Sequence, residues 1–101
     1  MKVLKFGGSS VASSQSIQQV LEIVKQTSKN DTTIIVVSAF GKTTDKLLKT
    51  ANNAVKNIAY ESLLQEVEEH HLLVIKELIS VSNQSEVISY VKRIFNHLET
   101  L

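Results

Sequence analysis

The chain has 101 residues, 43% of them hydrophobic, and its 11 basic and 10 acidic side chains leave a formal net charge of +1. This length fits one domain, and the aliphatic content excludes a disordered tail. The balanced charge argues against a nucleic acid partner, and no apolar run reaches the ~20 residues that span a bilayer. Because there is no cysteine, disulfides and thiolate metal sites are excluded. We expect a cytoplasmic protein without a signal peptide.

The first part of the chain predicts one β-α-β unit. Residues 2–6 form a short apolar run that ends at Gly7 and Gly8, which predicts a strand followed by a turn. Ser9 and Ser10 can cap a helix of about 18 residues, because a hydroxyl accepts from unpaired first-turn N–H groups. Residues 33–37 (Thr-Ile-Ile-Val-Val) are all β-branched and predict a second strand, parallel to the first and apolar on both faces.

Three further helices are predicted in the rest of the chain. Apolar residues recur at helical spacing over 43–58 and again over 63–78. Asn83 and Glu86 have the spacing of a capping box and predict the start of a last helix, which runs to the end of the chain. Two parallel strands leave both sheet edges open, although a buried parallel sheet normally has more neighbours. We therefore expect the N-terminal piece of a larger α/β domain.

The segment after the first strand is the first candidate site. Ligands of open α/β sheets bind at the carboxyl ends of the strands. The glycine pair Gly7-Gly8 lets the backbone approach an anion, and the start of the next helix offers free N–H groups. Lys5 adds a positive charge on a flexible stem, which suits phosphate oxygens. The pattern predicts phosphate binding; the alternative is an ordinary strand–glycine–helix turn with a surface lysine.

The segment after the second strand, residues 38–45, is the second candidate site. Gly41 and the two residues after it resemble the end of a P-loop, but the Walker pattern requires a glycine five positions earlier, where Val36 stands. The sequence therefore argues against a P-loop. Ser38 and Thr44 offer hydroxyls that can bind a small polar substrate. The alternative is that Ser38 is a turn hydroxyl and Thr44 a helix cap.

The three histidines do not predict a metal site. His70 and His71 are adjacent, so on a helix they point about 100° apart and cannot both face one ion. His71 falls in the apolar stripe of its helix and is expected to be a hydrogen-bonded core histidine, whereas His70 is expected to face water. His97 has no partner at metal-ligand spacing.

Both candidate segments resemble the aspartate kinases of the amino-acid kinase family. Residues 3–11 read VLKFGGSSV, and the family's usual signature is KFGGTSV. Residues 36–39 (VVSA) and 44–48 (TDKLL) resemble the family's second motif. The resemblance is sharp over 1–50 and only general over 51–101, where the family has a helical insertion. It implies a fragment of a three-layer α/β/α fold, with residues 1–101 forming the N-terminal part of an incomplete catalytic domain.

The resemblance also implies an activity. Aspartate kinases transfer the γ-phosphoryl group of ATP, with Mg²⁺, to the side-chain carboxylate of aspartate and form aspartyl phosphate. Lys5 would contact the phosphoryl group in flight and act as the catalytic residue. The residues carried over are Lys5, Gly7, Gly8 and Ser9 for the ATP phosphates, and Ser38 and Thr44 for aspartate. Ser9 replaces the usual threonine of the signature and keeps its hydroxyl.

Members of this family continue well beyond position 101, with further substrate-binding and catalytic residues and regulatory domains. We therefore expect the isolated chain to be inactive and the full-length protein to be a homo-oligomer, either single-function or fused to a homoserine dehydrogenase. Two alternatives stay open. One is a different amino-acid kinase, and the other is a non-catalytic binding or oligomerisation module.

Overall fold

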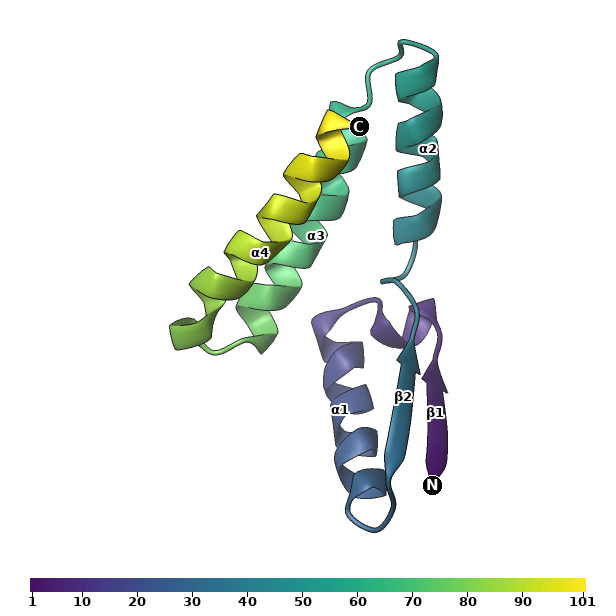
Figure 1. Cartoon of the computed structure of the whole chain (residues 1–101), viewed down its shortest axis with the longest axis vertical. Helices are drawn as coiled ribbons and strands as arrows, with labels where there is room; N and C mark the ends of the chain where they lie inside the picture. The colour runs from purple at the N-terminus through teal and green to yellow at the C-terminus, as the bar shows by residue number, and fades with distance from the viewer. The chain divides into compact units, whose positions relative to one another are not determined.

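A computed structural model describes residues 1–101, which divide into two compact units, Met1–Asp45 and Lys46–Leu101. The expected α/β composition, with parallel strands at 2–6 and 33–37 and four α-helices, is confirmed. The single incomplete domain over 1–101 stays a prediction. The elements in chain order are β1 (Lys2–Phe6), a 3-10 helix η1 (Gly8–Val11), α1 (Ser14–Ser28), β2 (Thr33–Val37), α2 (Thr43–Val55), α3 (Glu61–Leu78) and α4 (Val81–Thr100) (Figure 1).

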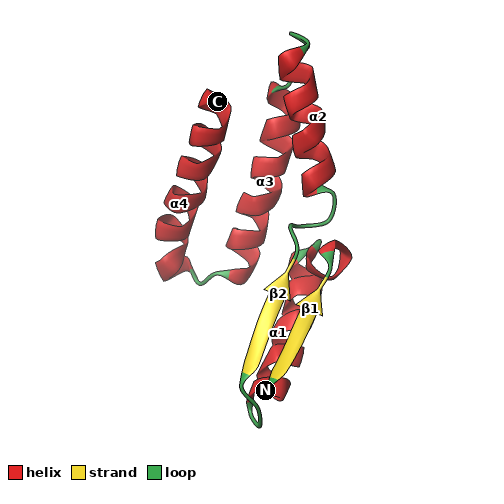
Figure 2. Cartoon of the chain, turned by 45° about the vertical axis from the view of Figure 1, so that its right-hand side comes forward, coloured by secondary structure: helices red, strands yellow, loops and turns green.

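The unit Met1–Asp45 is a parallel two-stranded sheet with α1 on one face (Figure 2). Lys5 lies opposite Val36, and Phe6 lies opposite Val37. Because side chains alternate along a strand, Lys5 and Val36 share one face and Phe6 and Val37 share the other. Phe6 lines a pocket together with Val20 of α1, so its face is the one that α1 covers. The Lys5 face therefore points away from α1.

The apolar residues on the Lys5 face of the sheet remain about half exposed. Val3 is 62% exposed, Ile34 46% and Val36 45%. A parallel sheet is normally covered on both faces, and strands of this composition are typical of such sheets. This exposure agrees with the expectation that the two strands are part of a larger α/β sheet.

The start of α1 differs from the prediction. The chain after Gly7 forms the single turn η1, which contains Ser9 and Ser10, and α1 begins only at Ser14. The cap is Ser13, whose Oγ accepts a hydrogen bond from the backbone N–H of Ser16 at 3.1 Å. The predicted Ser9–Ser10 cap was wrong because Ser13 satisfies that first-turn N–H group instead, and α1 has 15 residues rather than about 18.

The unit Lys46–Leu101 is helical, and α3 and α4 form an antiparallel pair (Figure 1). Its core joins Leu64 and Val67 of α3 to Phe95 of α4. The ring of His71 meets Phe95 edge-on, with centroids 5.6 Å apart, and its Nδ1 lies 2.8 Å from the carbonyl oxygen of Val67. The predicted hydrogen bond of His71 is confirmed, but its side chain is only partly buried, and so is that of His70, which was expected to face water. No helix in the structure is both long and apolar enough to cross a membrane.

An exposed ion pair links α2 to α3. The Nζ of Lys46 donates to Oε1 of Glu66 at 2.8 Å. This hydrogen bond, together with the positive charge of Lys46, lowers the pKa of the Glu66 carboxyl below its ordinary value. Leu47, the residue after Lys46, packs against the apolar cluster formed by Leu64, Val67 and Phe95.

The start of α4 also differs from the prediction. The helix begins at Val81, with Ser80 as its N-cap, rather than at Asn83. The backbone N–H of Asn83 donates to the carbonyl oxygen of Ser80 at 2.9 Å, and its Nδ2 donates to the Ser80 Oγ at 3.0 Å. The predicted capping box with Glu86 was wrong because Asn83 lies inside the first turn and acts as a donor there.

The end of α2 is set by Asn57, so the helix stops at Val55 and does not reach position 58 as predicted. Asn57 has a φ of 57°, the left-handed region. The N–H of Asn57 donates to the carbonyl of Ala54 at 3.2 Å, and the N–H of Ile58 donates to that of Asn53 at 2.8 Å. These two bonds form a Schellman motif, in which the left-handed residue favours glycine or asparagine.

We expect Asn57→Ala to lower the free energy of unfolding by about 1 kcal/mol, because alanine resists the left-handed conformation. Asn57→Gly is expected to leave it unchanged or to raise it slightly. Urea unfolding followed by circular dichroism measures both variants. Equal destabilisation by alanine and glycine would show that the Asn57 side chain matters rather than its backbone angle.

Candidate functional site

The two predicted motifs lie side by side at one edge of the sheet. Because β1 and β2 are parallel, the segments that follow them leave from the same end of the strands (Figure 1). The N–H of Ser38 donates to the carbonyl of Phe6 at 3.1 Å, and the N–H of Gly41 donates to that of Gly8 at 2.9 Å. We call residues 7–11 the first loop and residues 38–42 the second loop. Two backbone hydrogen bonds therefore tie the second loop to β1 and the first loop.

The three glycines of these loops have different surroundings. A Cβ added to Gly8 would lie 3.2 Å from the carbonyl oxygen of Gly41 and 3.3 Å from that of Ala39. Gly41 has a φ of +38°, and its added Cβ would lie 3.3 Å from the Cβ of Ala12. At Gly7 an added Cβ would meet nothing within 4 Å, and its φ of −76° suits any residue. Packing against the second loop favours glycine at position 8, the positive φ favours it at position 41, and neither restricts position 7.

The structural role of Gly41 was missed by the sequence analysis, which considered this residue only as part of a P-loop pattern. A usable signal was present, since a lone glycine stands between the end of a strand and the first turn of a helix. A glycine at such a position marks a turn or a close approach of two backbone segments. Gly41 has both features, a positive φ and a backbone hydrogen bond to Gly8. Only the pairing of the two strands tells which backbone Gly41 approaches.

Lys5 is exposed on the face of the sheet that α1 does not cover. Lys2 of the same strand pairs with Asp31 at 3.6 Å, whereas no carboxylate pairs with Lys5. Ser38 continues the ladder of β2 through its bond to Phe6, and one more step of the alternation puts it on the Lys5 side. The arrangement places a free ammonium group and a hydroxyl-bearing residue at the carboxyl end of the sheet.

The two remaining predicted site residues, Ser9 and Thr44, are both exposed. Ser9 is exposed in η1 and lines a shallow pocket of about 240 Å³ with Phe6 and Val20, on the side that α1 covers. Thr44 is exposed in the first turn of α2, which begins one residue earlier at Thr43, so Thr44 is not the cap of this helix. The structure shows no contact between the side chain of either residue and Lys5.

The chain contains no group of three or more His, Asp or Glu side chains that could hold a metal ion. His70 and His71 have their ring centroids 6.3 Å apart and their planes tilted by 56°. The ring of His71 already contacts the carbonyl oxygen of Val67 and the ring of Phe95.

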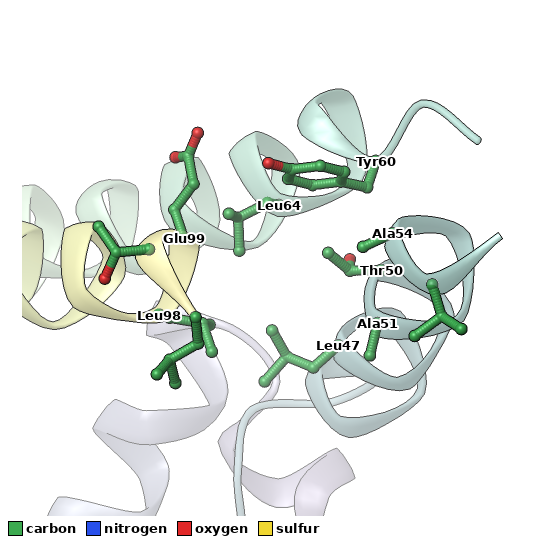
Figure 3. A pocket seen from close by; sticks show the side chains of 11 residues that line it. Leu47, Thr50, Ala51, Ala54, Tyr60, Leu64, Leu98 and Glu99 are labelled. Carbon is green, nitrogen blue, oxygen red and sulfur yellow. The ribbon is translucent and has the colours of Figure 1, made fainter. Parts of the chain in front are cut away.

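The helical unit has a separate pocket of about 420 Å³. In Figure 3, Leu47, Ala51 and Ala54 of α2 face Leu64 of α3 and Leu98 of α4 across it. The lining is mainly apolar, and the Oγ1 of Thr50 already donates to the carbonyl of Lys46 at 2.8 Å. None of the predicted site residues lines this pocket, and no lysine, arginine or histidine is among its lining residues.

Comparison with known proteins gives the same family as the two motifs. The model of the amino acid kinase family matches residues 1–98. Aspartokinase 1, chloroplastic, of Arabidopsis thaliana is 39% identical over 80 residues, which cover 75% of this chain and 14% of that protein. The aspartokinase of Geobacillus stearothermophilus is 46% identical over 50 residues, 48% of this chain and 12% of that protein.

A bifunctional aspartokinase/homoserine dehydrogenase of Buchnera aphidicola subsp. Acyrthosiphon pisum (strain APS) is 28% identical over 104 residues. This match covers 100% of the chain and 13% of that protein. The chain thus spans about an eighth of the length of the curated relatives that it matches. The resemblance to aspartate kinases is confirmed, and the matched range covers both loops and nearly all of the helical unit. The chain belongs to the amino acid kinase family.

Proposed function

We propose that this chain forms the phosphoryl-binding part of an ATP-dependent kinase that phosphorylates the side-chain carboxylate of aspartate. The observation that carries the proposal is the pair of hydrogen bonds that holds the second loop, which contains Ser38, against the end of β1, which contains Lys5, and against the first loop. A donor phosphate and an acceptor carboxylate must lie next to each other for transfer. Membership of the amino acid kinase family and the likeness to aspartokinases support this interpretation.

The proposed reaction depends on positioning and on charge. A carboxylate oxygen of aspartate attacks the γ-phosphorus of ATP, the bond to the β,γ-bridging oxygen breaks, and ADP leaves with that electron pair. Lys5 would neutralise charge on the phosphoryl oxygens as this happens, and the backbone at Gly7 would approach the phosphates. Mg²⁺ enters as part of the MgATP substrate. Ser38 and Thr44 would bind the polar groups of aspartate.

The test is an assay of the natural full-length protein with ATP, Mg²⁺ and aspartate, in which hydroxylamine traps aspartyl phosphate as the hydroxamate. Aspartate-dependent hydroxamate and ADP supports the proposal. Turnover with N-acetylglutamate and none with aspartate would instead assign a different amino-acid kinase. The 101-residue chain alone is expected to be inactive, because it spans so little of its relatives; activity of the chain alone would contradict this expectation.

Ser38→Ala and Thr44→Ala are expected to raise the KM for aspartate about 10- to 100-fold each, with smaller effects on the KM for ATP. The physical reason is the loss of one hydrogen bond to a charged ligand, which is worth about 1.5–3 kcal/mol. Steady-state kinetics with each substrate varied in turn measures this. Thr44→Ser keeps the hydroxyl and is the matched control. Unchanged aspartate saturation in both alanine variants would remove these residues from the acceptor site.

A further inference from the structure

We propose that Gly8 and Gly41 are positioning residues, whose direct backbone packing sets the spacing between the phosphate-binding first loop and the acceptor-binding second loop. This inference rests on the proposed function for the roles of the two loops. It assigns different tasks to the adjacent glycines Gly7 and Gly8. Gly7 leaves room for a ligand, whereas Gly8 leaves room for the second loop.

The evidence at Gly8 is the closeness of the second loop. The carbonyl oxygens of Ala39 and Gly41 would lie 3.3 and 3.2 Å from an added Cβ. Real Cβ atoms are rarely so near a backbone oxygen, and backbone cannot swing aside as the end of a flexible side chain can. A methyl group at position 8 therefore pushes the second loop away, and it strains the 2.9 Å bond between Gly41 N–H and the Gly8 carbonyl.

Gly41 holds the other side of the same contact. Its φ of +38° lies in the left-handed region, where any residue with a Cβ is strained. Its added Cβ would also press on the Cβ of Ala12 at 3.3 Å, just after η1. Next along the chain, the N–H of Thr43 donates to the carbonyl of Phe40 at 2.8 Å and leads into α2. A displacement of the backbone at Gly41 therefore also moves Thr44, which follows it in the chain, and Ser38, which precedes it.

Gly7 differs from Gly8 and Gly41 in its backbone angles and in the space around it. Its backbone angles are ordinary, and the chain leaves open space where its Cβ would be. Nothing in the folding of this unit therefore requires glycine at position 7. The two glycines can be separated by experiment, because alanine at position 7 meets only what binds there, whereas alanine at position 8 meets the second loop.

The experiment compares Gly7→Ala, Gly8→Ala and Gly41→Ala in the full-length protein, with KM and kcat measured for ATP and aspartate separately. Gly8→Ala and Gly41→Ala are expected to raise the KM for aspartate about tenfold, because the competent loop conformation becomes about tenfold rarer. Gly7→Ala is expected to raise the KM for ATP instead. Adding Ala12→Gly to Gly41→Ala removes the methyl contact and should recover part of the aspartate affinity; Ala12→Gly alone gives the baseline.

A second readout does not depend on activity. Amide hydrogen exchange of the Gly41 N–H reports its bond to Gly8, and we expect faster exchange in Gly8→Ala and unchanged exchange in Gly7→Ala. If the protein does not phosphorylate aspartate, the proposed function fails, while the exchange rates still test the packing. Similar exchange rates and similar kinetic changes in Gly7→Ala and Gly8→Ala would overturn the inference. Equal effects of Gly41→Ala on both substrates would overturn its role at the acceptor loop.

Discussion

Lys5→Ala is expected to lower kcat of the natural full-length protein by about 10²–10³-fold while changing the KM for aspartate much less. During transfer, charge spreads over the oxygens of the phosphoryl group, so a fixed positive charge stabilises the transition state more than the bound substrates. Lys5 suits this role because it is exposed at the end of β1 and no carboxylate neutralises it. Steady-state kinetics with saturating MgATP measures the change.

Lys2→Ala is the matched control for this experiment. Lys2 belongs to the same strand and is also exposed, but it lies on the opposite face of the sheet and pairs with Asp31 at 3.6 Å. Exposed ion pairs contribute little to stability, so this variant should keep kcat within about twofold. An increase in KM for aspartate with unchanged kcat in Lys5→Ala would mean that Lys5 binds the acceptor instead.

The strands could be predicted from sequence because their signals are local. Residues 33–37 are all β-branched, and the glycines at 7 and 8 end the first apolar run, so both strands match their predicted ranges. The helix starts were less certain, because several hydroxyl or amide side chains can satisfy the same first-turn N–H groups. At α1 the Ser13 side chain takes this role rather than that of Ser9 or Ser10. At α4 the cap position is Ser80 rather than Asn83; the Ser80 side chain accepts from no first-turn N–H group, and its carbonyl accepts from the N–H of Asn83.

The relation between the two loops could not be read from local sequence. Sequence reasoning placed Lys5, Gly8 and Ser38 at the ends of strands, and parallel pairing implies that those ends are neighbours. The close approach of Gly8 to Gly41 depends on the strand register and on the φ of Gly41, which no local motif specifies. The alternative interpretation of Thr44 as the cap of α2 is wrong, because the turn from Phe40 to Thr43 starts the helix one residue earlier.

Phe95→Ala is expected to lower the free energy of unfolding of the helical unit by about 3–5 kcal/mol. Phe95 is 8% exposed and joins α4 to Leu64 and Val67 of α3. Its loss leaves a cavity in a small core and removes the edge contact with His71. Because single domains are stable by only about 5–15 kcal/mol, this variant should approach the unfolding threshold. Urea unfolding followed by helical circular dichroism measures the loss.

Tyr90→Ala is the matched control, because Tyr90 is another aromatic residue of α4 but is 62% exposed. Its replacement should change the free energy of unfolding by about 0.5 kcal/mol or less. Phe95→Leu retains most of the buried volume and loses only the ring contact with His71, so its cost should stay below about 1.5 kcal/mol. Similar losses for Phe95→Ala and Tyr90→Ala would mean that the contact of α4 with α3 does not stabilise this unit. The ordering expected from burial is therefore Phe95→Ala, then Phe95→Leu, then Tyr90→Ala.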